Sequence, residues 1–264
     1  IIYKGMSILY ITDHKIFILG DEFMSATVYN FKRYELKYMI SRTQYEELLY
    51  QLRNHIVEDK FFKSSISNIY YDTPSYKLIR QSLEKPIYKE KFRIRSYSPY
   101  PKAEDEVFLE LKKKYKKVVY KRRIKSTVKQ SKTYLNDISL LKEEGQIGKE
   151  IEYFFNYHNF LKPAMYIYYD RYSYKGANDE SLRITFDYNL KYRDYDLSLE
   201  NGSYGLNLID KEFMLMEIKI SGSIPIWLNK IFVDLEIFQH SFSKYGEAYK
   251  KTIKESIYDN RIIV

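Results

Sequence analysis

Basic side chains recur at every second position in several stretches of the sequence. In "KFRIRSY", residues 91–97, Lys91, Arg93 and Arg95 alternate with apolar or small side chains. Alternate residues of an extended strand face the same side of a sheet, so one side of this strand is strongly cationic. Arginine forks and lysine ammonium groups bind phosphate oxygens well, so this spacing favours recognition of phosphate.

Other stretches with the alternation of a strand repeat the pattern. A half-buried strand usually alternates apolar residues with polar ones that face water. Here the polar face is charged and mostly basic in one stretch after another. The charged residues at matching positions are Arg33, Glu35, Lys37, Glu110, Lys112, Lys114, Lys121, Arg123, Lys125, Arg171, Arg183, Asp187, Glu217 and Lys219.

The opposite face of these stretches is apolar, with residues such as Phe92, Leu109 and Met216. Amphipathic helices elsewhere in the chain can cover that face, and the charged face would then point inward. Eight strands can close into a barrel whose interior holds side chains or one small ligand. Like charges enclosed there repel each other and lose hydration, so the lumen must stay wet and receive an anion. A chain of phosphates matches that field.

Four acidic residues share the basic face, and two roles are open to them. Each can be an ion-pair partner of the neighbouring cations. One or more can instead bind a divalent cation together with phosphate oxygens, because carboxylates suit Mg²⁺ or Mn²⁺. Glu35 fits both roles equally, with Lys37 or an arginine as its ion-pair partner.

The composition fits a folded protein with an anionic partner. The chain has 264 residues, a net charge of +9 and no cysteine, which excludes disulfides and thiolate metal sites. The charge favours a polyanion or an acidic membrane surface. No apolar run approaches ~18 residues, so no transmembrane helix is expected. The lack of cysteine favours a reducing, cytoplasmic location.

The periodicity predicts one α+β domain over residues 32–258, preceded by an extension, 1–31, to which no chemistry is assigned. Met24 is a candidate natural start. Ser41 and Gln44 form a capping box that opens a helix to about Val57. Further helices are predicted at 73–84, 127–135, 148–161 and, broken near Phe242 to Tyr245, at 226–258. The eight predicted strands are 33–40, 64–72, 87–97, 105–114, 117–126, 164–174, 181–192 and 212–220.

Nine motifs along the patterned chain resemble one known family. They are "YELKY", "YYDTP", "KFRIRSY", "FLELKKK", "YKRRIKS", "YDRYSY", "LRITFD", "MEIKI" and "FSKYGEAY". In this order, over about residues 32–254, they resemble the vacuolar transporter chaperone (VTC) domain, the polyphosphate polymerase branch of the triphosphate tunnel metalloenzymes, which are CYTH-like proteins. The resemblance implies an eight-stranded antiparallel tunnel with helices outside. It also implies transfer of the ATP γ-phosphate to a growing polyphosphate chain with a divalent metal, typically Mn²⁺.

The resemblance also implies roles for individual residues. Glu217 would be the metal-binding carboxylate, with Glu35 as a less certain second ligand, and Lys244 would lie on a C-terminal helix at the tunnel mouth. Tyr70 and Asp72 are less certain site residues. Arg93, Arg95, Lys112, Arg171 and Arg183 would also hold the phosphates of ATP. The basic residues expected to bind phosphate are Lys37, Arg93, Arg95, Lys112, Lys121, Arg123, Arg171, Arg183 and Lys219.

One departure bears on the choice between activities. The hydrolase relatives open with E-x-E-x-K, whereas Arg33 here replaces the first acid before Glu35 and Lys37. Fewer carboxylates fit a polymerase that binds ATP and polyphosphate or pyrophosphate better than a hydrolase. The alternatives are a tunnel-fold triphosphatase or polyphosphatase, and a non-enzymatic polyanion binder. A nucleic-acid duplex cannot enter an eight-stranded lumen, so no nucleic acid is expected as a partner. The sequence sets no oligomeric state.

Overall fold

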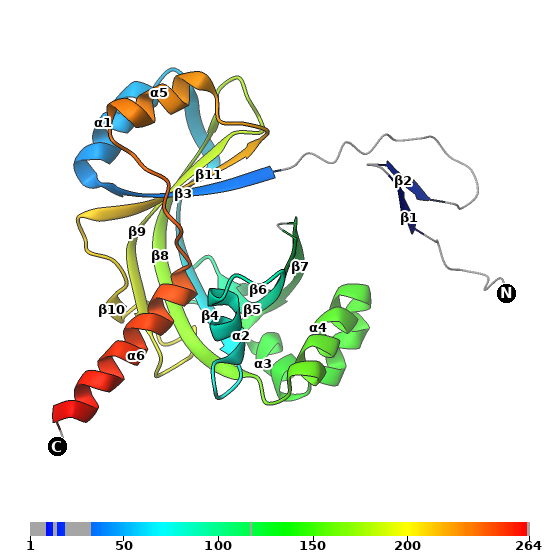
Figure 1. Cartoon of the computed structure of the whole chain (residues 1–264). Coiled ribbons are helices and arrows are strands. Elements are labelled where there is room, and N and C mark those ends of the chain that lie inside the picture. The colour runs from blue at the N-terminus through cyan, green and yellow to red at the C-terminus, as the bar shows by residue number, and fades with distance from the viewer. Residues whose placement is uncertain (1–8, 13–14, 19–32, 117, 263–264) are drawn as a thin grey trace.

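The computed structural model of the protein describes residues 9–12, 15–18, 33–116 and 118–262 (Figure 1). Of the predicted extension 1–31, only a separate antiparallel hairpin is described, formed by β1 (Leu9–Thr12) and β2 (Lys15–Ile18). The rest of that extension, Met24 included, lies outside the described residues. The main body combines one large antiparallel sheet with helices, which confirms the α+β class.

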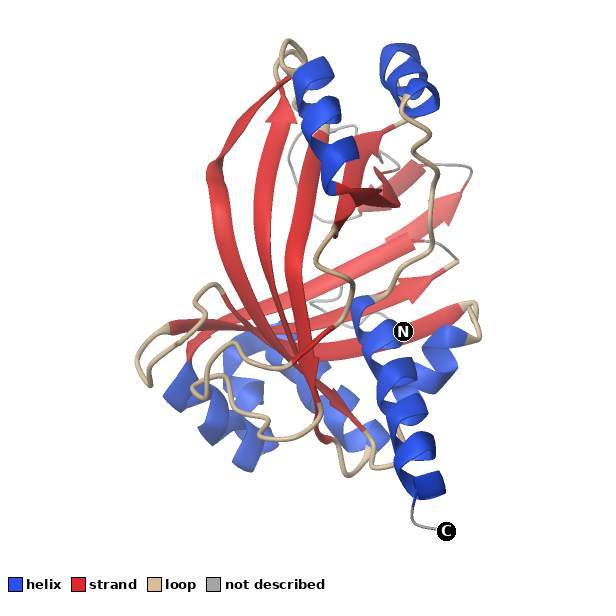
Figure 2. Ribbon diagram, turned by 90° about the vertical axis from the view of Figure 1, so that its left-hand side faces the viewer, coloured by secondary structure: helices blue, strands red, loops and turns tan. Residues whose placement is uncertain are grey.

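The sheet contains all eight predicted strands and a short additional one. Its order is β3-β11-β9-β8-β4-β5-β6-β7, and the short strand β10 pairs with β9. The strands are long and strongly curved (Figure 2). Their bounds are β3 (Arg33–Ser41), β4 (Ile56–Asp72), β5 (Tyr88–Ser96), β6 (Glu106–Tyr115), β7 (Val118–Thr127), β8 (Lys162–Gly176), β9 (Arg183–Arg193), β10 (Leu206–Asn207) and β11 (Phe213–Ser221).

The sheet is not closed, so the predicted barrel is not confirmed. Its two edge strands, β3 and β7, share no ladder within the described part of the chain. A different segment occupies the edge of β3: Gln239 forms a bridge with Tyr38, and the His240 N–H donates to the Lys37 carbonyl at 2.7 Å. The connection between the last two helices therefore takes the place that β7 would need for closure.

Several predicted boundaries shift for local reasons. The capping box of Ser41 and Gln44 is confirmed at the start of α1 (Arg42–Leu52). This helix ends well before Val57, because β4 begins at Ile56 rather than Ser64. The helix predicted to start near Pro74 begins only at Lys77, as α2 (Lys77–Leu83). Tyr76 before it has a φ of 56°, a left-handed conformation that the first turn of a helix cannot contain.

Two groups of helices cover the outer face of the sheet, the face opposite the charged residues. Over β3, β9 and β11, α1 and α5 (Ile226–Asp234) bury Leu48 and Leu228 against residues such as Met216. Over β5 to β7, α3 (Val128–Asn136), a 3₁₀ helix η1 (Ile138–Glu144) and α4 (Gly145–His158) bury Phe154 against Phe92. Each such buried side chain stabilises the fold by about 1.5–3 kcal/mol.

The inner face is divided between an apolar part and a charged part. The apolar part is covered by the start of α6 (Lys244–Ile262), which packs Tyr245 and Ala248 against Ile167, Met165 and other buried residues of β8, β9 and β11. Figure 1 shows α6 in red beside the curved sheet, apart from the two groups of outer helices. The rest of the inner face carries the alternating charges.

Candidate functional site

The register of β5, β6 and β7 arranges the predicted basic residues in rows across the inner face. Arg93 lies opposite Glu110, which lies opposite Arg123. The next row, two residues along each strand, contains Lys91, Lys112 and Lys121. The first row has one carboxylate and the second has none, so this half of the face carries an excess of positive charge.

Glu110 is the centre of the first row. Its side chain is buried, and its carboxylate lies 2.8 Å from the Arg93 Nη2, 2.7 Å from the Lys121 Nζ and 3.0 Å from the Arg123 Nε. Arg95 adds a fourth cation at 3.7 Å. Burial raises the pKa of this carboxyl group, but the neighbouring cations outweigh it and hold the pKa well below its usual range. Glu110 therefore stays ionised and fixes the positions of four cations.

A second cluster lies on the neighbouring strands β3 and β11. The Lys37 Nζ lies 3.3 Å from Glu35 and 3.7 Å from Glu217, and the Lys219 Nζ lies 2.5 Å from Glu217. Burial raises the pKa of Glu217, but Lys219, Lys37, Lys244 and Arg171 together outweigh it and lower this pKa well below its usual range. Lys112 of β6 reaches to 3.9 Å from Glu35 of β3. The charged residues of β3 and those of β6, near opposite edges of the sheet, therefore approach each other across the inner face.

A third cluster joins the sheet to α6. Asp187 is fully buried, and Arg171 contacts its two oxygens at 2.5 and 2.8 Å. Lys244, the first residue of α6, contacts the same carboxylate at 2.5 Å. The residues just before it are also engaged, because the Lys37 Nζ donates to the Phe242 carbonyl at 3.1 Å and the Lys91 Nζ to the Ser243 Oγ at 3.2 Å. The start of α6 is thus part of the cationic surface.

The three clusters together form an inner face of cations whose positions are fixed by the buried carboxylates of Glu110, Asp187 and Glu217. The chain also matches a known family. The model of the VTC domain matches residues 32–253. The chain belongs to the VTC domain family.

Solved structures add only distant likenesses to this VTC domain. A candidate adenylate cyclase from Bacillus halodurans is 15% identical over 79% of this chain and 92% of its own, with a TM-score of 0.45. A second candidate adenylate cyclase, from Vibrio parahaemolyticus, is 12% identical over 81% of this chain and 96% of its own, with a TM-score of 0.41. No curated protein matches the chain. The family assignment therefore rests on the match to the family model.

Most of the predicted phosphate-binding residues of the VTC domain lie together on the inner face. Arg183 lies at its margin, where its Nη2 is 2.6 Å from Asp59 and its side chain is 54% exposed. The side chain of Arg33 lies outside the described part of the structure. The residues that the structure brings together around Glu110, Glu217 and Asp187 are Lys37, Arg93, Arg95, Lys112, Lys121, Arg123, Arg171, Lys219 and Lys244.

Tyr169 also lies in the site, although the sequence pattern of alternating charges does not predict it. Its hydroxyl lies 3.4 Å from the Arg95 Nη2, and its ring lies 4.4 Å from the Lys244 Nζ. Burial raises the pKa of this phenol, but Arg95, Arg171 and Lys244 together lower it to about 8. The phenol links the Glu110 cluster to the Asp187 cluster. A sequence signal was present, because Tyr169 has the same strand parity as Arg171.

Tyr70 and Asp72, the less certain residues of the "YYDTP" motif, take different positions. The Tyr70 hydroxyl accepts a hydrogen bond from the Arg93 Nη1 at 2.9 Å. Asp72 is fully buried and accepts four hydrogen bonds: from the amides of Thr73, Leu78 and Ile79, and from the Tyr245 hydroxyl at 2.8 Å. Asp72 thereby fixes the start of α2 and the first turn of α6, and has no acceptor left for a ligand.

A divalent cation would have few protein ligands here. The described residues include no group of three or more His, Asp or Glu side chains that could hold a metal ion. Burial and the nearby Glu217 raise the pKa of the Glu35 carboxyl group, but the surrounding lysines outweigh them and lower it overall, so this carboxylate stays ionised. Mg²⁺ and Mn²⁺ commonly use one or two carboxylates together with substrate phosphates. The pair fits such an ion only if phosphate oxygens complete its coordination.

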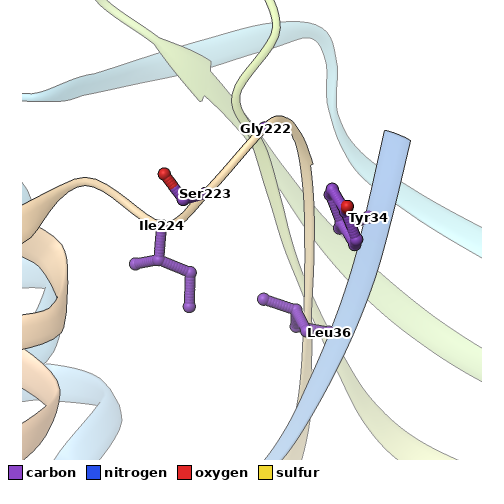
Figure 3. A pocket seen from close by; sticks show the side chains of 5 residues that line it. All are labelled: Tyr34, Leu36, Gly222, Ser223 and Ile224. Carbon is purple, nitrogen blue, oxygen red and sulfur yellow. The ribbon is translucent and has the colours of Figure 1, made fainter. Parts of the chain in front are cut away.

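A surface hollow near the start of β3 is not part of this site. It measures about 370 Å³ and is lined by Tyr34, Leu36, Gly222, Ser223 and Ile224 (Figure 3). Tyr34 and Leu36 alternate with Glu35 along β3 and therefore lie on its other face. The lining offers no charged group for a phosphate. No helix in the described part of the chain is long and apolar enough to cross a membrane.

Proposed function

We propose that this VTC domain is a polyphosphate polymerase that transfers the γ-phosphate of ATP to a growing polyphosphate chain. The observation that carries the proposal is the excess of cations on the inner face. Glu110 contacts four of them, including Lys121 of the adjacent row, and that row holds two more lysines and no carboxylate. Desolvated like charges are costly unless an anion joins them. A polymer of phosphates neutralises them along its whole length.

Phosphoryl transfer depends on positioning and on neutralising charge more than on covalent chemistry. Arg93, Arg95 and Arg123 present guanidinium groups whose positions Glu110 already fixes, so little ordering is needed when phosphates bind. Lys244 and Arg171 lie on the same inner face, where Tyr169 contacts both Arg95 and Lys244. The nucleophile would be a terminal phosphate oxygen of the acceptor, which is largely ionised near neutral pH, so no general base is required.

Glu217, with Glu35 beside it, would hold the divalent cation, Mn²⁺ or Mg²⁺. When bound, such an ion would neutralise negative charge on the phosphate oxygens. Lys37 contacts both carboxylates and would have to share them with the cation. These assignments come from the carboxylate geometry and from the family resemblance.

Incubation of the purified protein with ATP and Mn²⁺ tests the proposal. A polymerase yields acid-labile phosphate chains together with ADP, and Arg93→Ala abolishes them while the remaining cations still neutralise Glu110 and preserve the fold. Orthophosphate without chains would instead identify a tunnel-fold phosphohydrolase. Tight polyphosphate binding without turnover would identify a non-enzymatic binder.

A further inference from the structure

Four lysines continue the cationic face beyond the arginine row. Lys91 lies directly opposite Lys112, and Lys89 lies directly opposite Lys114, on β5 and β6. Like charges at facing positions of a sheet destabilise it. Among the described residues, no carboxylate lies within ion-pair distance of Lys89, Lys91 or Lys114, and Lys112 has only Glu35 at 3.9 Å. The fold therefore maintains a repulsive arrangement that it does not neutralise itself.

Lys89 and Lys91 make hydrogen bonds with neutral oxygens. The Lys91 Nζ donates to the Ser243 Oγ at 3.2 Å, and the Lys89 Nζ donates to the Ser82 carbonyl at 3.0 Å. Burial and then Lys89 and Lys112 lower the pKa of Lys91 to about 7. Burial and then Lys114 also lower the pKa of Lys89. An anion at this position would relieve the repulsion and restore full protonation.

The position of the lysines extends the candidate site in one direction. Four residues along a strand span about 13 Å, so the Lys89–Lys114 pair lies about that far from the Arg93–Glu110 pair. Ser82 near the end of α2 and Ser243 just before α6 border the lysines on one side. A ligand limited to three phosphates at the arginines would leave the outer lysine pair unused, whereas a longer linear chain reaches it.

We propose that Lys89, Lys91 and Lys114, together with Lys112, form a second anion subsite that binds the distal phosphates of a linear polyphosphate whose near end lies at Arg93 and Arg123. The proposal rests on the proposed function for its ligand class, a chain of phosphates. It predicts that affinity depends on chain length, since only long chains occupy both parts of the site.

The test is calorimetric titration of the intact protein, without ATP or metal, with tripolyphosphate and with a polyphosphate long enough to span both clusters. Lys89→Gln combined with Lys114→Gln should weaken binding of the long chain about tenfold and leave tripolyphosphate binding unchanged. Lys129→Gln combined with Lys132→Gln removes the same charge from α3, where each lysine contacts a glutamate, and should change neither affinity. Thermal melting should show that the Lys89/Lys114 variant is at least as stable as the parent, because it loses a repulsion.

Two outcomes separate this subsite from the proposed function. If the parent binds long chains through these lysines but synthesises none, the polymerase assignment fails and the subsite stands. If the parent makes chains while the Lys89/Lys114 variant binds long and short chains as the parent does, the subsite is wrong and the function stands. An equal loss of affinity for both chain lengths would also overturn the subsite.

Discussion

The two halves of the inner face have the same strand alternation but differ in the side chains that it turns inward. On β5 and β6, the inward positions are Lys91, Arg93 and Glu110, and water or a ligand must cover them. On β8 and β11, some inward positions are apolar, as at Ile167 and Leu215, and α6 covers them. The difference shows that parity defines a face, while the helix that is available to cover it decides how much of that face can receive a ligand.

The carboxylates of the inner face differ in the same sense. Glu110 is almost completely buried and contacts four cations, so it is an organising charge with no capacity for a metal. Glu217 contacts two lysines, one of which it shares with Glu35. Removing the first should therefore damage the fold more, and removing the second should damage phosphoryl transfer more.

Glu110→Gln is expected to have the largest effect on stability. Four cations would lose their shared counter-ion in a buried position, which costs about 3–5 kcal/mol of unfolding free energy. Chemical denaturation measures the loss, and tripolyphosphate should restore much of it by supplying negative charge. The matched control is Glu150→Gln, because Glu150 also contacts two basic residues but lies on the outer face and is 22% exposed. A loss no greater than the control's, about 1 kcal/mol, would contradict the organising role of Glu110.

Glu217→Gln should have the opposite pattern, with a large effect on chain synthesis and a small effect on stability. We expect chain synthesis to fall at least a hundredfold, because the ligand that would hold the cation is lost. The unfolding free energy should change by only about 1 kcal/mol, because Lys37 keeps Glu35 as a partner and the Lys219 side chain is 40% exposed to water. Synthesis rates measured against Mn²⁺ concentration, beside denaturation curves, separate the two effects. A parental rate together with an unchanged dependence on Mn²⁺ concentration would show that Glu217 is not the metal ligand.

Much of the site followed from the sequence, because register preserves parity. Lys112 and Lys121 face each other across β6 and β7 as their alternation implies. Lys91 is near a strand end, so its alternation alone does not show whether it lies at the site or in solvent; in the structure it contacts Ser243, just before α6. That contact joins residues far apart in the chain, and no local pattern contains it.

The failure of barrel closure has a similar origin. Eight alternating strands are compatible with either a closed or an open sheet, and hydrogen-bond partners at the edges decide between them. Here the segment at Gln239 and His240 takes the edge of β3. Nothing in the strand pattern reveals that an irregular connection competes for that edge.

Tyr245→Phe probes the half of the inner face that α6 covers. The variant removes one buried hydrogen bond to Asp72 and keeps the stacking of the ring on Tyr70, at 4.8 Å between centroids. We expect the free energy of unfolding to fall by about 1 kcal/mol. Tripolyphosphate binding should also weaken, because Lys244 lies next to Tyr245 in the same turn of α6. Tyr249→Phe, one turn later and with its ring tilted against that of Tyr76, should affect binding little.

A double-mutant cycle shows whether Tyr245 acts through Lys244. In the Lys244→Ala background, Tyr245→Phe should cost no further tripolyphosphate affinity, because the group that it positions is already absent. Additive losses of affinity would mean that the hydroxyl supports the fold in general and does not position Lys244.

Lys91→Met should have the smallest effect, and the effect depends on pH. Burial and the cations around Lys91 lower its pKa from 10.5 to about 7 in the folded protein. Between these values the unfolded chain binds more protons than the folded one, so the parent gains stability as pH rises. The stability advantage of Lys91→Met should be greatest near pH 7 or below and should shrink toward pH 10. Tyr169 titrates in both proteins, so the difference between them isolates Lys91.

A saturating long-chain polyphosphate, which would reach the lysine subsite, sharpens this last comparison between the charged half of the inner face and the half that α6 covers. A bound anion beside Lys91 raises its pKa toward the ordinary value, so the pH dependence of the stability difference should largely disappear. Denaturation curves at several pH values, with and without the anion, measure it. If the difference between parent and Lys91→Met is constant from pH 7 to pH 10 without anion, Lys91 is fully hydrated and charged. The repulsive lysine rows would then exert no measurable strain on the fold.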